Sequence, residues 1–213
     1  MILLHGQVGE QSLSNGTRAP VRISKNASLV LRDELSEEIL KGRAFIVANQ
    51  VGVTSQAGLS GTTPVLTLYN PTGSGVRGKL WMASAHLEVA SVAAASVWLA
   101  AGTNTVAAAV TGTLTTAHRN LKLGSAGVVA GSQGNRVVPL LAATLPAAPV
   151  AIDLIGVGLT GAITTVPALS SMSKFYPGGC IYIEEGCNIS IQTSTASGAA
   201  GLLCSYIWSE EEK

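Results

Sequence analysis

Two glycine-rich stretches have the Gly-x-Gly-x-x-Gly spacing of dinucleotide-binding loops, at residues 73–78 and 156–161. Such a loop holds a pyrophosphate only where a helix follows, because the N–H groups at the helix N-terminus meet the anion. The residues that follow are KLWMASAHLEV and AITTVP, and neither sequence has the pattern of a helix. Both stretches are therefore interpreted as turns, the first as the bend of a hairpin.

Groups for acid–base or nucleophilic catalysis are few. The histidines are His5, His86 and His118, and the aspartates are Asp33 and Asp153. His86 with Asp153 is the only pair that could be nominated for a hydrolase, and a strand histidine is more commonly a satisfied or half-exposed residue than a general base. No Gly-x-Ser-x-Gly nucleophile elbow is present. We expect no catalytic residue and no enzyme activity.

Metal ligands and disulfide partners are scarce. Cys180 and Cys187 lack the two-residue spacing of zinc knuckles and have no histidine near them in the sequence. With Cys204 they make an odd number of cysteines, which in a chain of this length predicts free thiols. Glu184 and Glu185 fall in a predicted turn, where charged side chains are expected to be exposed to solvent. We expect no metal and no cofactor.

The chain has 213 residues, a net charge of +1 and a charged fraction of 12%. That fraction is about half of the ~25% typical of soluble domains. A nearly neutral chain offers no electrostatic case for nucleic acid or an anionic membrane. The longest apolar stretch, residues 89–101, is 13 residues long, short of the ~20 that a membrane span needs. We expect neither a nucleic acid nor a membrane as partner.

The charges are unevenly placed along the chain. Residues 1–50 hold 11 of the 25 charged residues, and residues 210–213 are all charged. We therefore expect a buried middle and wetter ends.

Short apolar runs separated by glycine, proline and asparagine recur at roughly 8–12-residue spacing, which indicates a β-sandwich or jelly roll. Residues 76–89 are predicted to form one long strand with Leu80, Met82 and Ser84 on one face. Neither face is strictly polar, which suits a strand partly covered on both sides. The sharpest hairpin pattern surrounds residues 184–186. One short helix is predicted at residues 33–41 and ends at Gly42.

Residues 1–22 have the composition of an extended N-terminal arm, because glycine, asparagine and proline interrupt them and no apolar periodicity persists. The predicted fold is thus all-β, a jelly-roll-like antiparallel β-sandwich over residues 23–213 with an extended N-terminal arm.

Four stretches carry a resemblance to a known family. They are LHGQVGEQSLSNGTRAPVR (4–22), ANQVGVTSQAGLS with TPVLTLYNPTGSGV (48–76), GVGLTGAITTVPA (156–168) and GGCIYIEEGCNISIQTSTASGAAGLLCSYIWSEE (178–211). The chain resembles a family of structural proteins encoded in tailed-bacteriophage genomes. The resemblance implies a virion component of β-sandwich type, such as a capsid decoration (cement) protein on the capsid surface. The implied partners are the major capsid protein or other virion subunits.

We expect symmetric copies, as a homotrimer, and an arm that clamps neighbouring units. The arm residues expected to bind a partner are Leu4, His5, Gln7, Glu10, Asn15, Arg18 and Arg22. Two alternatives stay open: a tail or receptor-binding (adhesion) module, and a virion-associated hydrolase.

Overall fold

The computed structural model of the protein describes residues 33–54, 56–87, 95–103, 110–115, 117–122, 136–158, 173–196 and 201–213. The chain divides into two units, Met1–Glu37 and Glu38–Lys213, and each is described by itself. The predicted arm falls outside the described residues.

The described elements are one short helix and twelve strands. Their bounds are α1 Glu34–Leu40, β1 Ala44–Ala48, β2 Leu66–Tyr69, β3 Val76–Leu87, β4 Ala95–Thr103, β5 Thr111–Leu114, β6 Arg119–Asn120, β7 Val138–Thr144, β8 Val150–Gly158, β9 Ser173–Phe175, β10 Ile181–Ile183, β11 Cys187–Thr193 and β12 Leu202–Glu212.

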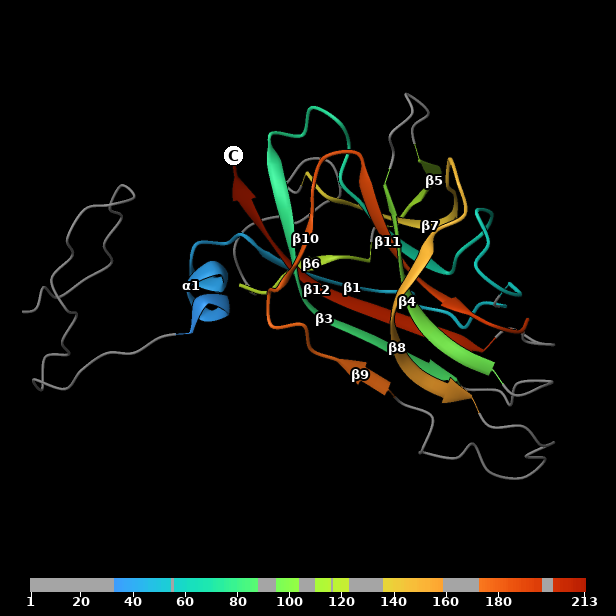
Figure 1. Cartoon of the computed structure of the whole chain (residues 1–213). Helices are drawn as coiled ribbons and strands as arrows, with labels where there is room; N and C mark the ends of the chain where they lie inside the picture. The colour runs from blue at the N-terminus through green and yellow to red at the C-terminus, as the bar shows by residue number, and fades with distance from the viewer. Residues whose placement is uncertain are drawn as a thin grey trace, which may run out of the picture. The chain divides into compact units, whose positions relative to one another are not determined.

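The strands form two antiparallel sheets (Figure 1). One has the order β10-β3-β12-β1-β6, with β9 also paired to β3, and the other has the order β5-β7-β2-β11-β4-β8. The pairs are nested along the chain: β1 pairs with β12, β2 with β11, β3 with β10 and β4 with β8. Eight strands folded back on themselves in this way, with two facing sheets of four, form a jelly roll. The predicted all-β, jelly-roll-like sandwich is confirmed.

Three strands between β4 and β8 extend this frame. β7 pairs with β2 and β5 pairs with β7, which widens the second sheet, while β6 widens the first sheet beside β1. A small apolar cluster, separate from the main core, accompanies this extension. Its buried members are Tyr69, Val110, Leu140, Ala143 and Leu145.

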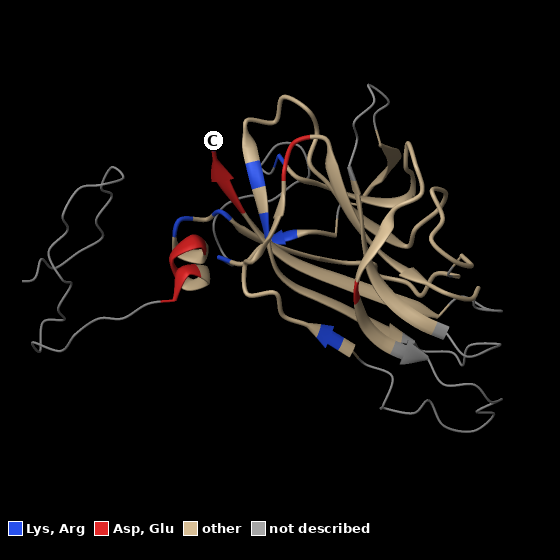
Figure 2. Cartoon of the chain, in the orientation of Figure 1, with Lys and Arg blue, Asp and Glu red and all other residues tan. Residues whose placement is uncertain are grey.

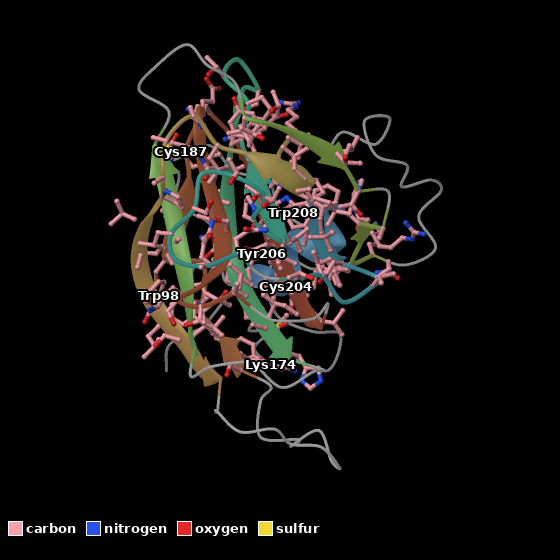
Figure 3. All side chains as sticks on the ribbon, turned by 90° about the vertical axis from the view of Figure 1, so that its right-hand side faces the viewer. Trp98, Lys174, Cys187, Cys204, Tyr206 and Trp208 are labelled. Atoms are coloured by element: carbon pink, nitrogen blue, oxygen red, sulfur yellow. The ribbon has the colours of Figure 1, made fainter. Side chains whose placement is uncertain are left out.

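The main core lies between the sheets and is centred on β12. Cys204, Tyr206 and Trp208 are alternate residues of that strand and are all buried, and Figure 3 shows them following one another along it. The Trp208 ring stacks on Phe45 with centroids 5.5 Å apart. The Tyr206 hydroxyl donates a hydrogen bond to the carbonyl of Leu66, 3.2 Å away in the other sheet. Further buried members are Leu68, Leu99, Ile189 and Ile191 of the second sheet.

A β-bulge interrupts the alternation of β3. Leu80 lies opposite Trp208 while Met82 lies opposite Ile207, so Trp81 is an extra residue on its strand. The buried side of β3 therefore changes at this point. The prediction of one continuous face through Leu80 and Met82 is wrong. The buried apolar side chains are those of Val76 and Leu80 before the bulge, and of Ala83 and Ala85 after it.

Both predicted hairpins are wrong, because each turn carries the chain from one sheet to the other. Residues 70–75 join β2 to β3, and residues 184–186 join β10 to β11, and in each case the two strands belong to different sheets. The buried side-chain amide of Asn70 donates to the carbonyls of Val76 and Ile183, both at 2.8 Å. One amide thus fastens the two crossings together.

The predicted helix is confirmed as α1. Asp33 caps it, since its carboxylate accepts hydrogen bonds from the backbone N–H and the hydroxyl of Ser36 at 2.8 and 2.7 Å. Gly42 follows the helix with φ of 72°, a conformation that favours glycine and stops the helix.

Candidate interaction surface

Strand β8 presents three large apolar side chains to solvent. Val150, Ile152 and Leu154 are 69%, 46% and 53% exposed. The register of β8 against β4 shifts at Ile152, so Val150 lies opposite Ala101 and Leu154 opposite Trp98, and the three do not share one strict face. They follow one another along a strand on which residues 150–154 are all exposed. Single exposed apolar residues are ordinary on soluble proteins, whereas a contiguous apolar patch points to a contact surface. We call these three side chains the β8 row.

The row lies at the edge of its sheet. Among the described strands β8 pairs only with β4, where Trp98 lies opposite Leu154. Directly opposite residues of an antiparallel pair point to the same side of the sheet. The half-buried indole of Trp98, labelled beside this edge in Figure 3, therefore extends the row onto the neighbouring strand.

The middle of the β8 edge carries a charge. The carboxylate of the exposed Asp153 accepts a hydrogen bond from the backbone N–H of Leu154 at 2.7 Å. An edge strand whose N–H group is occupied, and which bears a charge, is a poor template for pairing with another strand. The β8 row thus offers exposed apolar surface for packing, while Asp153 hinders strand addition along the edge.

The second glycine motif lies partly within β8. Gly156 and Gly158 are strand residues, so the prediction of a turn from residue 156 is wrong, and Gly161 falls outside the described residues. A Cβ atom at Gly156 would overlap the Ser173 hydroxyl oxygen and would lie 2.8 Å from the Ser173 Cβ. Glycine is therefore needed here because β8 passes directly against β9.

The first glycine motif does bind an anion, but the anion belongs to the chain itself. Gly73 and Gly75 have φ of 81° and 73°, and their N–H groups donate to the Glu185 carboxylate at 3.2 and 2.9 Å. Successive N–H groups in a turn form such an anion-binding nest. The bonds from Gly75 and Gly73 lower the pKa of Glu185, and Lys213 acts in the same direction. Glu185 therefore ties one sheet crossing to the other.

Glu210 departs from the prediction of a wet charged end, because its side chain is buried in the fold. Its carboxylate accepts hydrogen bonds from the backbone N–H groups of Arg136 and Val137, at 2.9 and 3.0 Å, and from the Trp208 indole at 3.3 Å. Burial raises the pKa of Glu210, and the N–H donors oppose this effect. This carboxylate fastens the start of β7 to the end of β12.

Charged residues in unit Glu38–Lys213 gather mainly around the end of β12, and much of the opposite half of the described ribbon lacks them (Figure 2). Several are paired: Glu184 lies 3.1 Å from Arg77 and 2.9 Å from Lys213. Strands β8 and β9 carry one charged residue each, Asp153 and Lys174. The β8 row is thus a mainly uncharged surface.

The structure does not bring together His86 and Asp153, the pair that the sequence suggested for hydrolysis. His86 lies on β3 of one sheet and Asp153 on β8 of the other, and no hydrogen bond links them among the described residues. The buried His118 has its Nδ1 atom 3.1 Å from the carbonyl of Thr115. The predicted arm residues fall outside the described residues; they are Leu4, His5, Gln7, Glu10, Asn15, Arg18 and Arg22.

The prediction of free thiols is confirmed, with Cys180 exposed, Cys187 half-buried and Cys204 buried. Burial raises the pKa of the Cys204 thiol, and burial followed by the charge of Glu184 raises that of Cys187. Within the described ranges, no three His, Cys, Asp or Glu side chains form a group that could hold a metal ion.

Sequence reasoning missed the β8 row and the role of Glu210. The signal for the row was available: a strand with an aspartate at its middle is poorly suited to full burial, so its apolar residues are candidates for exposure. Glu210 had no comparable signal, because its partners Arg136 and Val137 are 74 and 73 residues away in the chain.

In the described part of the chain no helix is both long and apolar enough to span a membrane. Comparison with known proteins finds no family model, no curated protein and no solved structure that matches the chain.

Proposed function

We propose that this chain is a non-enzymatic structural protein of a virion, a capsid decoration (cement) protein that binds the head lattice and stabilises it. The observation that carries the proposal is the β8 row, an apolar surface at the edge of a jelly roll. Jelly rolls occur in viral capsid domains and also in lectins and cupins, so the fold alone does not decide the function. The resemblance of four stretches of the chain to bacteriophage virion proteins adds support.

The size of the row suits weak contacts that are repeated. A standard protein interface uses about 20–30 residues from each side, and the row supplies three. One such contact does not offset the ~4–15 kcal/mol that association costs. Copies arranged on a lattice make several contacts at once, and avidity then supplies the missing affinity. A homotrimer on a capsid surface meets this requirement.

Residues 1–22 are proposed to make the second contact, with the major capsid protein or another virion subunit. This segment contains the seven residues nominated from the sequence, of which Arg18 and Arg22 carry positive charge and Glu10 negative charge. Arm and row together would clamp adjacent capsid units.

The test is co-sedimentation of the purified protein with capsid shells that lack it. We expect the full chain to bind, a variant lacking residues 1–22 to lose binding with its β circular dichroism intact, and Ile152→Ser to weaken binding. Binding by both variants at the full-chain level would overturn the proposal. Adhesion to host cells without binding to shells would instead favour a tail or receptor-binding module. Imaging of purified virions at subunit resolution then locates the protein.

A further inference from the structure

A small cavity lies where β1 begins and β12 ends. It has a volume of about 200 Å³, and its lining includes Arg43, Phe45, Val76, Arg136, Glu210 and Glu212. Pockets for drug-sized ligands are larger, about 300–1,000 Å³. This cavity suits a side chain or a small acid.

The guanidinium of Arg136 is positioned but weakly bound. Its backbone N–H is held by Glu210 at 2.9 Å, which fixes where the side chain begins. The guanidinium contacts the carbonyl of Ser74 at 3.4 Å and the carboxylate of Glu212 at 3.5 Å. Both distances exceed the 2.7–3.2 Å typical of a good N–H···O bond. Arg43, by contrast, makes two bonds of 2.7 Å to Glu38.

The two glutamates of the cavity differ in how firmly they are held. The buried Glu210 carboxylate accepts three N–H donors, which offset its charge. The side chain of Glu212 is 73% exposed and makes one long contact with Arg136. Glu212 can therefore leave Arg136 at little cost, because exposed ion pairs contribute little stability.

We propose that this cavity binds a carboxylate carried on a short apolar stem, which replaces Glu212 on the Arg136 guanidinium. A planar guanidinium recognises a carboxylate through two parallel hydrogen bonds, a geometry that the 3.5 Å contact does not achieve. The displaced Glu212 carboxylate, whose side chain is 73% exposed, would remain in solvent beside the site. Phe45 and Val76, both nearly fully buried, are the apolar residues of the lining on which the stem would lie. The inference does not rest on the proposed function.

The first experiment is an NMR titration of the full chain with sodium propionate at constant ionic strength, with neutral propionamide as the matched control. We expect a saturable shift of the Arg136 Nε–H resonance with propionate and none with propionamide. Arg136→Gln should abolish the saturable shifts of neighbouring amides. Arg77→Gln removes the same charge from a side chain that is equally exposed, 43% in both, and should leave binding unchanged.

Glu212→Gln supplies a test that misfolding cannot imitate. Because this variant removes the competing carboxylate, it should bind propionate several-fold more tightly than the natural chain. Unchanged affinity in Glu212→Gln, or equal binding by Arg136→Gln with a native amide spectrum, would overturn the proposal. Equal shifts with propionamide would overturn it as well.

A second titration distinguishes the sources of the carboxylate. The probes are the blocked peptides Gly-Glu-Gly and Gly-Gln-Gly. Binding of the glutamate peptide at least as tight as that of propionate identifies an acidic side chain of a neighbouring protein as the ligand. Binding of propionate alone identifies a small free acid. Binding of the glutamine peptide as tight as that of the glutamate peptide would contradict carboxylate recognition.

Discussion

The carboxylate of Glu210 accepts a hydrogen bond of 2.9 Å from the backbone N–H of Arg136, which lies 74 residues earlier in the chain. With the Val137 N–H and the Trp208 indole, this carboxylate joins the start of β7 to the last strand. Two parts of the fold that share no β-ladder in the described sheets are thereby connected.

Glu210→Ala should destabilise the protein by at least ~2 kcal/mol, because it leaves buried N–H donors without an acceptor. Glu210→Gln keeps one acceptor oxygen and should lose less than half as much. Urea denaturation measures both values. Glu212→Ala, two residues away and 73% exposed, is the matched control and should stay within ~0.5 kcal/mol of the natural chain. A neutral Glu210→Ala would contradict the assigned role.

The stability contribution of Glu210 should depend on pH in a defined direction. Burial raises its folded-state pKa above the ordinary value of 4.5. The contribution of Glu210 to the free energy of unfolding is thus fully present at a pH below the ordinary pKa. It is lost as the pH rises through the folded-state pKa. The free-energy difference between the natural chain and Glu210→Gln should therefore shift in favour of the natural chain as the pH falls toward 4.5. Urea titrations between pH 4 and 8 measure the shift, and an opposite slope would contradict it.

Glu185 should show the opposite pH dependence, because its folded-state pKa lies below the ordinary value of 4.5. Its contribution is present above that value and is lost as the pH falls through the lowered folded-state value. Glu185→Gln should therefore be less stable than the natural chain at pH 7 and approach it below pH 4. Glu184→Gln changes the same charge at the adjacent position, outside the glycine nest, and serves as the control. A constant difference across this range would show that the nest does not bind the carboxylate.

The positions of the strands and the end of the helix could be predicted, because they depend on residues that are close in the sequence. Gly42 adopts its positive φ within one turn of α1, and β12 shows its alternation in its own residues. The partners of strands could not be predicted, since the Asn70 amide that links the two sheet crossings reaches Ile183, 113 residues away. The bulge at Trp81 likewise appears only in the register against Trp208. The edge position of the candidate surface could not be predicted either, because it depends on the pairing of β8 with β4.

Gly156→Ala should be destabilising by about 1–3 kcal/mol, because the added methyl group overlaps Ser173 and forces β9 to move. Ser173→Gly removes both atoms that the new Cβ would meet. The double variant should therefore recover much of the loss, and a double-mutant cycle by thermal unfolding measures this coupling. Strict additivity of the two changes would show that the two strands do not touch at this point.

Asp153 should control how the β8 edge associates. Asp153→Val removes both the charge and the acceptor of the Leu154 N–H, and it makes residues 150–155 a continuous apolar strand. Such an edge is a template for pairing with other copies, so this variant should form larger species as its concentration rises. Asp153→Asn keeps an acceptor oxygen for Leu154 and should remain close to the natural size, and light scattering after gel filtration measures both variants. If the association follows from edge pairing, adding Ile152→Lys to Asp153→Val should reverse it, because a charge then returns to the edge. Persistence of the large species in this double variant would show that the copies contact each other elsewhere.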